Sequence, residues 1–269
     1  MRVLVSDRPR GAAACSRPRR ALVSALAEAR RERWWRTGPP LRSLDEAREY
    51  IEDVGLSLLF GGGAARYPSL REASRDVTLR REPSGWADDI EAMWTWKDTL
   101  PVTGDAWLGR YLSGRQTLLA PGLLADLYPH PGDEDDVEHA PGLSPEARRV
   151  AVHILAEGPL STRRLRSELG VAGKTFDRAV TELGRSLLVT NYGVEKGPGW
   201  DSCVIELTSR AFSVPSPDAR FERDARAAAV FADTMVKVRP GDLCRTFGWT
   251  RERAAEALAA GQGHPEPGL

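Results

Sequence analysis

The sequence predicts a mainly α-helical protein with small β-wings, arranged as a tandem winged-helix or helix-turn-helix architecture. Three observations predict this class. Residues 143–212 read as three short amphipathic helices followed by two β-branched runs. Residues 215–261 repeat a smaller helix-turn-helix pattern. Most of the remaining chain carries strong helix formers between N-cap residues and glycine or proline stop signals.

The composition is that of an ordinary globular protein, with 41% hydrophobic and 28% charged residues among 269. Lys plus Arg equals Asp plus Glu, 38 against 38, so no global field directs the protein to nucleic acid or membrane, and charge has to be read locally. The three cysteines are far apart and form no CxxC pair. This argues against a disulfide framework and favours a reducing cytoplasm. No apolar run approaches the roughly 20 residues of a membrane span, so no membrane partner is expected.

Shifts in composition divide the chain into six segments. These are a disordered basic tail (1–20), an N-terminal helical, winged-helix-like region (21–129), an acidic linker (130–142), a winged-helix domain (143–214), a C-terminal helix-turn-helix region (215–261) and a short tail (262–269). The linker contains "PHPGDEDDVEHAPG", whose prolines and missing helical spacing predict a solvated loop rather than a metal site.

The N-terminal region begins with two predicted helices. The first covers "ALVSALAEARRERWWR", and the second has Ser43 as its N-cap and ends near Gly55. Further on, "GDAWLGRYLSGRQTLLAPGLLADLY" is interpreted as helix, short break, helix. Just before that stretch, "MWTWKDTLP" (residues 93–101) places Trp94 and Trp96 on two stripes of one helix. Tryptophans on two stripes predict a segment packed on more than one side, with both rings in the core.

The winged-helix domain carries the clearest helical pattern. Its third helix, "VAGKTFDRAVTELGRS", places Phe176, Val180 and Leu183 at i, i+4 and i+7. The two β-branched runs are joined by the Gly/Pro-rich "EKGPGWDS". Helices this short cannot each bury a face alone, so they must pack on one another while the ribbon closes the open side. We therefore expect these three side chains and Ile205 to be buried.

A basic face on this domain is the main candidate for binding double-stranded DNA. A winged helix usually lays its third helix in the major groove, where Lys and Arg meet phosphates and guanine edges. The candidate residues are Arg163 and Arg164 on the second helix, Lys174, Thr175, Arg178 and Arg185 on the third, and Lys196 in the wing. Asp177, Glu168 and Glu182 dilute the positive charge. An ordinary solvated helix face is therefore the alternative interpretation.

Two stretches carry a resemblance to a known family. "VGLSLLFGGGAARYPSL" and "MWTWKDTLP", followed by the three-helix domain, resemble the AlkZ/YcaQ family of winged-helix DNA glycosylases, and more closely the AlkZ-related proteins. The resemblance covers roughly Leu41 to Phe212. It implies tandem winged helices around a DNA-binding channel, hydrolytic excision of alkylated bases, and no metal or organic cofactor.

The catalytic motif of that family is missing from this chain. The family's glycosylases carry Gln-apolar-Gln or Gln-apolar-Asp after a Leu-Gly pair. The corresponding stretch here starts at Val54-Gly55, so the motif positions fall on Leu58 and Phe60. Neither side chain can hydrogen-bond or polarise a water molecule. The resemblance therefore implies a DNA-binding, repair-associated protein without a confident catalytic residue.

Other function classes stay open. Lys97 and Asp98 replace a polar pair of the family and are the local candidates for a site, with an ordinary structural ion pair as the alternative. An active glycosylase that uses Asp98 is the rival enzyme hypothesis. A transcription regulator or protein-interaction module is the third.

Overall fold

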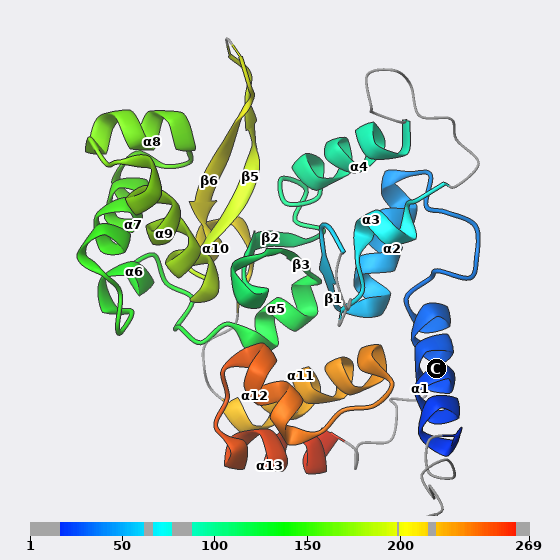
Figure 1. The fold of residues 1–269 in the computed structure, drawn as a ribbon. Helices are drawn as coiled ribbons and strands as arrows, with labels where there is room; N and C mark the ends of the chain where they lie inside the picture. The colour runs from blue at the N-terminus through cyan, green and yellow to red at the C-terminus, as the bar shows by residue number, and fades with distance from the viewer. Residues whose placement is uncertain (1–16, 62–66, 77–87, 198, 215–218, 262–269) are drawn as a thin grey trace, which may run out of the picture.

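The computed structural model describes residues 17–61, 67–76, 88–197, 199–214 and 219–261. The predicted tail at 262–269 and residues 1–16 of the predicted basic tail (1–20) lie outside these ranges, whereas residues 17–20 of that tail are helical. The described protein is mainly helical, with two small antiparallel sheets of three strands each (Figure 1). The predicted helical class with small β elements is therefore confirmed at this level.

The N-terminal region begins with four helices, α1 (Arg17–Arg33), α2 (Leu44–Val54), α3 (Leu70–Ala73) and α4 (Asp88–Thr99). The predicted cap of α2 is confirmed, because the Ser43 hydroxyl accepts the Glu46 amide at 3.1 Å. Gly55 ends α2 with a φ of 67°. A Cβ on Gly55 would lie 2.4 Å from Cγ1 of Val230, so this turn requires glycine both for its conformation and for its packing.

Two strands of the first sheet, β2 and β3, occupy a stretch for which the sequence predicted helix. Its strands are β1 (Leu56–Leu58), β2 (Trp107–Arg110) and β3 (Gln116–Leu119), in the order β1-β3-β2, with a 3-10 turn, η1 (Leu112–Gly114), before β3 and helix α5 (Pro121–Leu127) after it. Of the two helices expected here, α5 matches the second. The prediction of the first helix is wrong, because β2, η1 and β3 occupy its place. Trp107 pairs with Leu119 and Leu108 with Leu118, and these two pairs belong to different hydrophobic clusters. Burial on two opposite faces requires the two-residue period of a strand.

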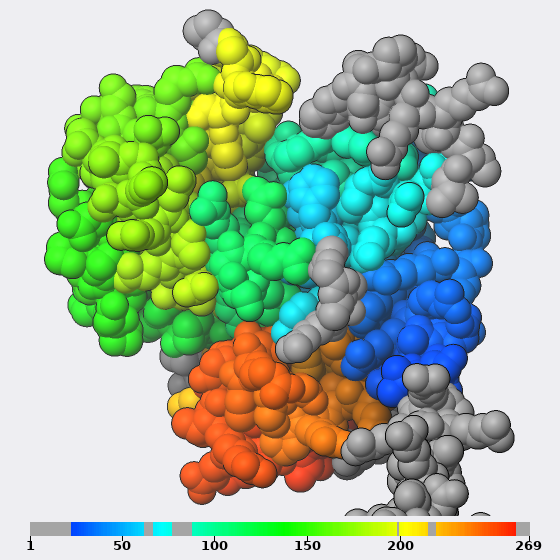
Figure 2. Space-filling model, in the orientation of Figure 1, coloured from blue at the N-terminus to red at the C-terminus, as the bar shows by residue number. Residues whose placement is uncertain are grey.

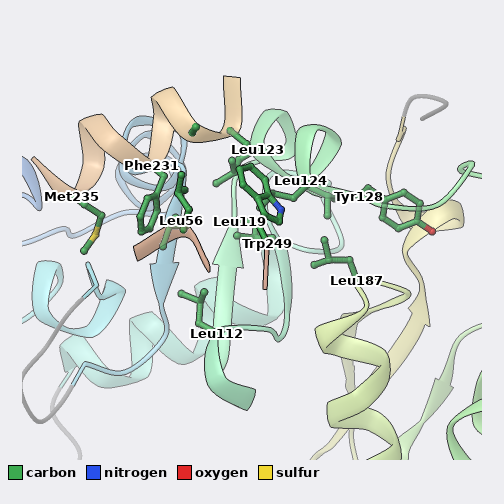
Figure 3. Packing of buried hydrophobic residues seen from close by; sticks show 14 of the residues in the cluster. Leu56, Leu112, Leu119, Leu123, Leu124, Tyr128, Leu187, Phe231, Met235 and Trp249 are labelled. Carbon is green, nitrogen blue, oxygen red and sulfur yellow. The ribbon is translucent and has the colours of Figure 1, made fainter. Parts of the chain in front are cut away.

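Helices cover both faces of this sheet. On the Trp107 face lie α5 and the C-terminal helices α11 (Arg220–Met235), α12 (Pro240–Phe247) and α13 (Arg251–Gly261). Figure 3 shows part of this cluster, with Phe231 and Trp249 near Leu56 and Leu119. On the Leu108 face lie α2 and α4. The C-terminal region therefore completes the core of the N-terminal region.

The second sheet belongs to residues 143–212. The elements are α7 (Pro145–Glu157), β4 (Leu160–Ser161), α8 (Thr162–Leu169), α9 (Gly173–Arg185), β5 (Val189–Glu195), β6 (Ser202–Leu207) and α10 (Thr208–Ala211), with sheet order β4-β6-β5. The three helices and the β5–β6 hairpin lie in the predicted order. Phe176, Leu183 and Ile205 are buried as expected, and Val180 is partly buried against the same cluster.

The segment predicted as an acidic linker is partly packed. It contains the short helix α6 (Asp136–His139), and Val137 is buried. The buried Asp136 carboxylate accepts the Tyr128 hydroxyl at 2.7 Å and the Gly132 amide at 3.0 Å. Both bonds end on Oδ2, while the buried Oδ1 has no hydrogen-bond partner among the described residues, so this carboxylate is packed inside the protein rather than facing water as the sequence suggested. In the described ranges, no three His, Cys, Asp or Glu side chains gather closely enough to hold a metal ion.

The two sheets meet along β2 and β5. The Thr190 hydroxyl lies 3.3 Å from both the amide and the carbonyl of Leu108. A Cβ on Gly184 of α9 would lie 2.9 Å from the Arg110 amide nitrogen, so α9 touches the backbone of β2 directly. Of the helices described, none has the length and apolar character needed to cross a bilayer.

Candidate functional site

Helix α9 presents one exposed basic stripe. Its core face carries Phe176 and Leu183, and Gly184 faces β2. At about 100° per residue, spacings of four and seven residues return to nearly the same side of a helix. The candidates Lys174, Arg178 and Arg185 follow these spacings and are all exposed. The stripe lies off the buried face of α9, so solvent reaches these side chains.

The cations of this stripe differ from the other predicted candidates. In the ranges that the structure covers, Lys174, Arg178 and Arg185 form no ion pair. By contrast, Arg164 binds Glu168, and Lys196 binds Asp201 at 2.7 Å. Arg163 lies 3.7 Å from Glu195 and donates to the Trp200 carbonyl at 2.6 Å. Thr175 is partly buried. The exposed arginines and lysine of α9 are therefore the ones that can meet phosphates without first losing a partner.

The acidic residues expected to dilute this charge are engaged elsewhere. Glu182 accepts the Ser144 hydroxyl at 2.7 Å and so holds the start of α7. Asp177 lies 4.0 Å from Arg110 of β2. Glu168 binds His153 as well as Arg164. Asp177 and Glu168 therefore face other cations, whereas Glu182 bonds a neutral hydroxyl and keeps its negative charge, four residues from Arg178 and three from Arg185 on the same helix.

A groove lies between α4 and the β5–β6 hairpin, which stand side by side in the space-filling view (Figure 2). Its volume is about 790 Å³, within the range of small-ligand sites. The lining residues are Glu91, Trp94, Thr95, Lys97, Asp98, Gln116, Asn191, Val194, Lys196, Gly199, Trp200, Asp201 and Cys203. The predicted local candidates Lys97 and Asp98 are therefore both in a groove.

Lys97 is held on two sides. It is only 6% exposed, it forms an ion pair with Asp98, and its Nζ atom lies 4.7 Å from the ring centroid of Trp94. A buried ammonium needs such partners, because burial removes its hydration. Trp96 is buried as predicted, but Trp94 is only partly buried and lines the groove. The core prediction for Trp94 is wrong because Met93, Trp96 and Leu100 already occupy the core face of α4 and the turn after it.

The lost catalytic motif positions have different environments. Leu58 is 1% exposed and belongs to the core. Phe60 is 38% exposed and lies outside the core, with its ring centroid 5.7 Å from that of Trp94. The side chain follows the end of β1, where the sheet no longer covers it. Neither position holds a group that could activate water.

Gln116 lies beside these positions although 56 residues separate it from Phe60 in sequence. Its carbonyl accepts the Leu59 amide at 3.0 Å, and its side chain lines the groove. Asn191 of β5 lines the same groove from the other sheet. Sequence reasoning missed both amides, since only the β1–β3 pairing and the contact between the sheets bring them there. Burial raises the pKa of the nearby Cys203 thiol to about 11, which disfavours the reactive thiolate at neutral pH.

Comparisons with known proteins give one finding. A family model described as AlkZ related matches residues 41–238, about three quarters of the chain. No curated protein and no solved structure matches the chain significantly. The matched range includes α4, the groove, the α9 stripe and α11.

Proposed function

Because the chain belongs to the AlkZ-related family, we propose that it is a DNA-repair-associated protein that binds double-stranded DNA and lacks the catalytic motif of the family's glycosylases. The observation that carries this proposal is the exposed, unpaired stripe of Lys174, Arg178 and Arg185 on α9. Phosphate contacts supply much of the affinity of DNA-binding proteins. The missing motif is supported by apolar side chains at Leu58 and Phe60.

The proposal includes a winged-helix assignment for residues 143–214. The order α7, β4, α8, α9, β5, β6 supports it, with α9 as the helix that enters the major groove and the hairpin as the wing. Residues 215–261 form the proposed helix-turn-helix region, whose turn is at Gly248, with a φ of 71° between α12 and α13. In this assignment the N-terminal region, including the first sheet, is the second winged-helix-like unit.

A salt series tests the binding proposal. Three phosphate contacts predict that the logarithm of the association constant for a duplex falls with the logarithm of salt concentration by a slope of about −2.7, at 0.9 per contact. Fluorescence anisotropy on matched and alkylated duplexes measures this slope, with base release assayed in parallel. We expect salt-dependent duplex binding and no release of alkylated base above background. A slope near zero would refute the contact.

An active glycosylase is the second candidate, favoured by one observation. Asp98 and Gln116 line the same groove, so a carboxylate and an amide are available to orient water. Base release by the purified protein that disappears in Asp98→Asn would establish this candidate. Release that survives the substitution would assign the chemistry to another group. A transcription regulator would instead bind one duplex sequence much more tightly than others in the same assay.

A further inference from the structure

The groove between α4 and the hairpin contains two side-chain amides that have no hydrogen-bond partner within the described part of the chain. Gln116 comes from β3 of the first sheet and Asn191 from β5 of the second, and both line the groove and a smaller cavity that shares these two residues and Cys203 with it. Among the residues described, neither amide group bonds to another protein atom. Each amide offers one acceptor and two donors. Such groups in a groove are available to a ligand.

The backbone around Asn191 is adapted to this arrangement. The β5–β6 register shifts between Asn191 and Val194, and both residues line the groove. An irregularity of this kind bends a strand and redirects its side chains, and it is common beside binding sites. In the first sheet, Gln116 is the first residue of β3 and pairs with Arg110, the last residue of β2. The two amides therefore approach from the two sheets on either side of β2.

The charge of the groove argues against a phosphate as its ligand. Lys97 pairs with Asp98, and Lys196 with Asp201. Glu91 adds a further carboxylate, so the five charged side chains sum to −1. A phosphate would have to break one of these pairs. A planar group with donors and acceptors on its edge requires no such change.

An exposed aromatic ring completes the site. Trp200, at the end of the hairpin, is 86% exposed and lines the groove opposite α4. Stacking on an aromatic side chain is the common way for proteins to hold unpaired bases. Amide side chains recognise adenine through its paired acceptor and donor atoms, N7 and N6.

From these contacts we propose that Gln116 and Asn191 form an amide pair that reads the edge of one unpaired DNA base, adenine being the best match, which stacks on Trp200 in this groove. This inference rests on the proposed DNA binding, which supplies the duplex. It assigns specificity to residues outside the α9 stripe and outside the lost motif. The duplex would contact α9 through its phosphates while one base enters the groove.

Competing duplexes test the proposal with the full chain. Affinities are measured for a matched duplex and for the same duplex carrying a single bulged adenine or thymine. We expect a preference for the bulged adenine that falls about 10-fold in Gln116→Ala and in Asn191→Ala, while affinity for the matched duplex is unchanged. Gln116→Glu keeps the size of the side chain but loses its donors, and it should reduce the preference as well. Thr95→Ala is the matched control, since Thr95 lines the groove but its hydroxyl already bonds the Glu91 carbonyl at 3.2 Å.

A second measurement separates this proposal from the proposed function. Adenosine is titrated while tryptophan fluorescence is recorded, with inorganic phosphate as the comparison. We expect quenching by adenosine that is lost in Trp200→Ala and weakened in Gln116→Ala, and no response to phosphate. Quenching without any duplex binding would keep the groove and refute the DNA proposal. Equal affinity for bulged and matched duplexes, unaffected by the amide substitutions, would overturn the amide pair even where duplex binding is strong.

Discussion

The two three-stranded sheets have similar size but different surroundings. The first, β1-β3-β2, is covered on one face by α5 and the C-terminal helices and on the other by α2 and α4. The second, β4-β6-β5, packs on α7 and α9, while its hairpin extends beyond them into solvent (Figure 1). The burial of β2 is nearly complete, whereas β5 changes from buried to exposed along its length.

This difference indicates that the first sheet stabilises the fold, whereas the hairpin of the second sheet is available to contact a ligand. A sheet buried on both faces stabilises the protein through its large side chains. A hairpin with exposed polar and aromatic side chains contributes little stability and can contact a ligand. The groove lies where the two kinds of sheet meet, so one wall adjoins a sheet packed on both faces and the other wall extends into solvent.

Among the changes considered, truncation of Trp107, the largest side chain in the first sheet, is expected to lower the free energy of unfolding most. Trp107 is fully buried, and its indole N–H donates to the Thr208 hydroxyl at 3.0 Å. Trp107→Ala should lower the free energy of unfolding by about 3–5 kcal/mol. The matched change in the hairpin, Val194→Ala, should cost less than about 1 kcal/mol because Val194 is partly exposed. Urea unfolding of both variants measures the difference, and similar losses would contradict the comparison.

The two lost motif positions test the boundary of the first sheet. Leu58→Gln buries an amide and removes apolar contacts, so it should lower the free energy of unfolding by about 3 kcal/mol. Phe60→Gln should lower it by about 1 kcal/mol or less, because that ring lies outside the core. Thermal and urea unfolding give both values. An equal cost would place Phe60 in the core after all.

Charge reversal on α9 tests whether duplex binding depends on the α9 stripe more than on the hairpin. Arg178→Glu should weaken duplex binding about 10-fold and reduce the magnitude of the salt slope by about 1, since one phosphate contact is lost. Lys196→Glu should have a smaller effect because Asp201 already neutralises that lysine. Arg251→Glu, an exposed arginine at the start of α13, controls for the change in net charge. Equal effects from Arg178 and Arg251 would show that binding follows net charge rather than the stripe.

The stability of the protein is expected to depend slightly on pH through His130, which lies in the segment between the two sheet regions. Burial lowers the pKa of His130 below its ordinary value of 6.5, although the hydrogen bond to the Ser186 carbonyl and the charge of Asp136 oppose the shift. The unfolded chain therefore binds a proton more readily than the folded protein. The stability from neutral His130 is fully present above pH 6.5 and falls as the pH drops towards the lowered value, by about 1.4 kcal/mol per unit of pKa shift at most.

His130→Phe removes this titration while keeping an aromatic ring against Tyr128, whose centroid lies 5.2 Å away. Its free energy of unfolding should vary less between pH 7 and pH 5 than that of the unchanged protein. Urea unfolding at both pH values measures this difference, and identical pH profiles would assign the dependence to other groups. This is the smallest of the four effects.

Local signals allowed much of the fold to be predicted. The Ser43 cap of α2 and the core face of α9 depend on residues within one or two turns, and the sequence contains those signals. The strands β2 and β3 lack a clear alternation of polar and apolar residues, because both of their faces are buried. Gln116 lies in the groove only because β3 pairs with β1 and because the first sheet lies close to β5. No spacing of residues along the chain reveals either contact. The rotation of α4 about its own axis, relative to the sheet, places Trp96 in the core and turns Trp94 towards the groove. This rotation cannot be read from the sequence of α4 alone.

The position of α11 has a consequence for how the chain folds during synthesis. The first sheet ends at Leu119, but the helices that cover one of its faces end only at Gly261. At about 5–20 residues per second, a ribosome needs roughly 7–28 s to make the intervening 142 residues. During that interval the Trp107 face of the sheet is without its cover, while residues 143–212 already hold every element of their own sheet. Residues 143–212 can therefore fold first, whereas the N-terminal region is completed last, after the C-terminal helices have been made.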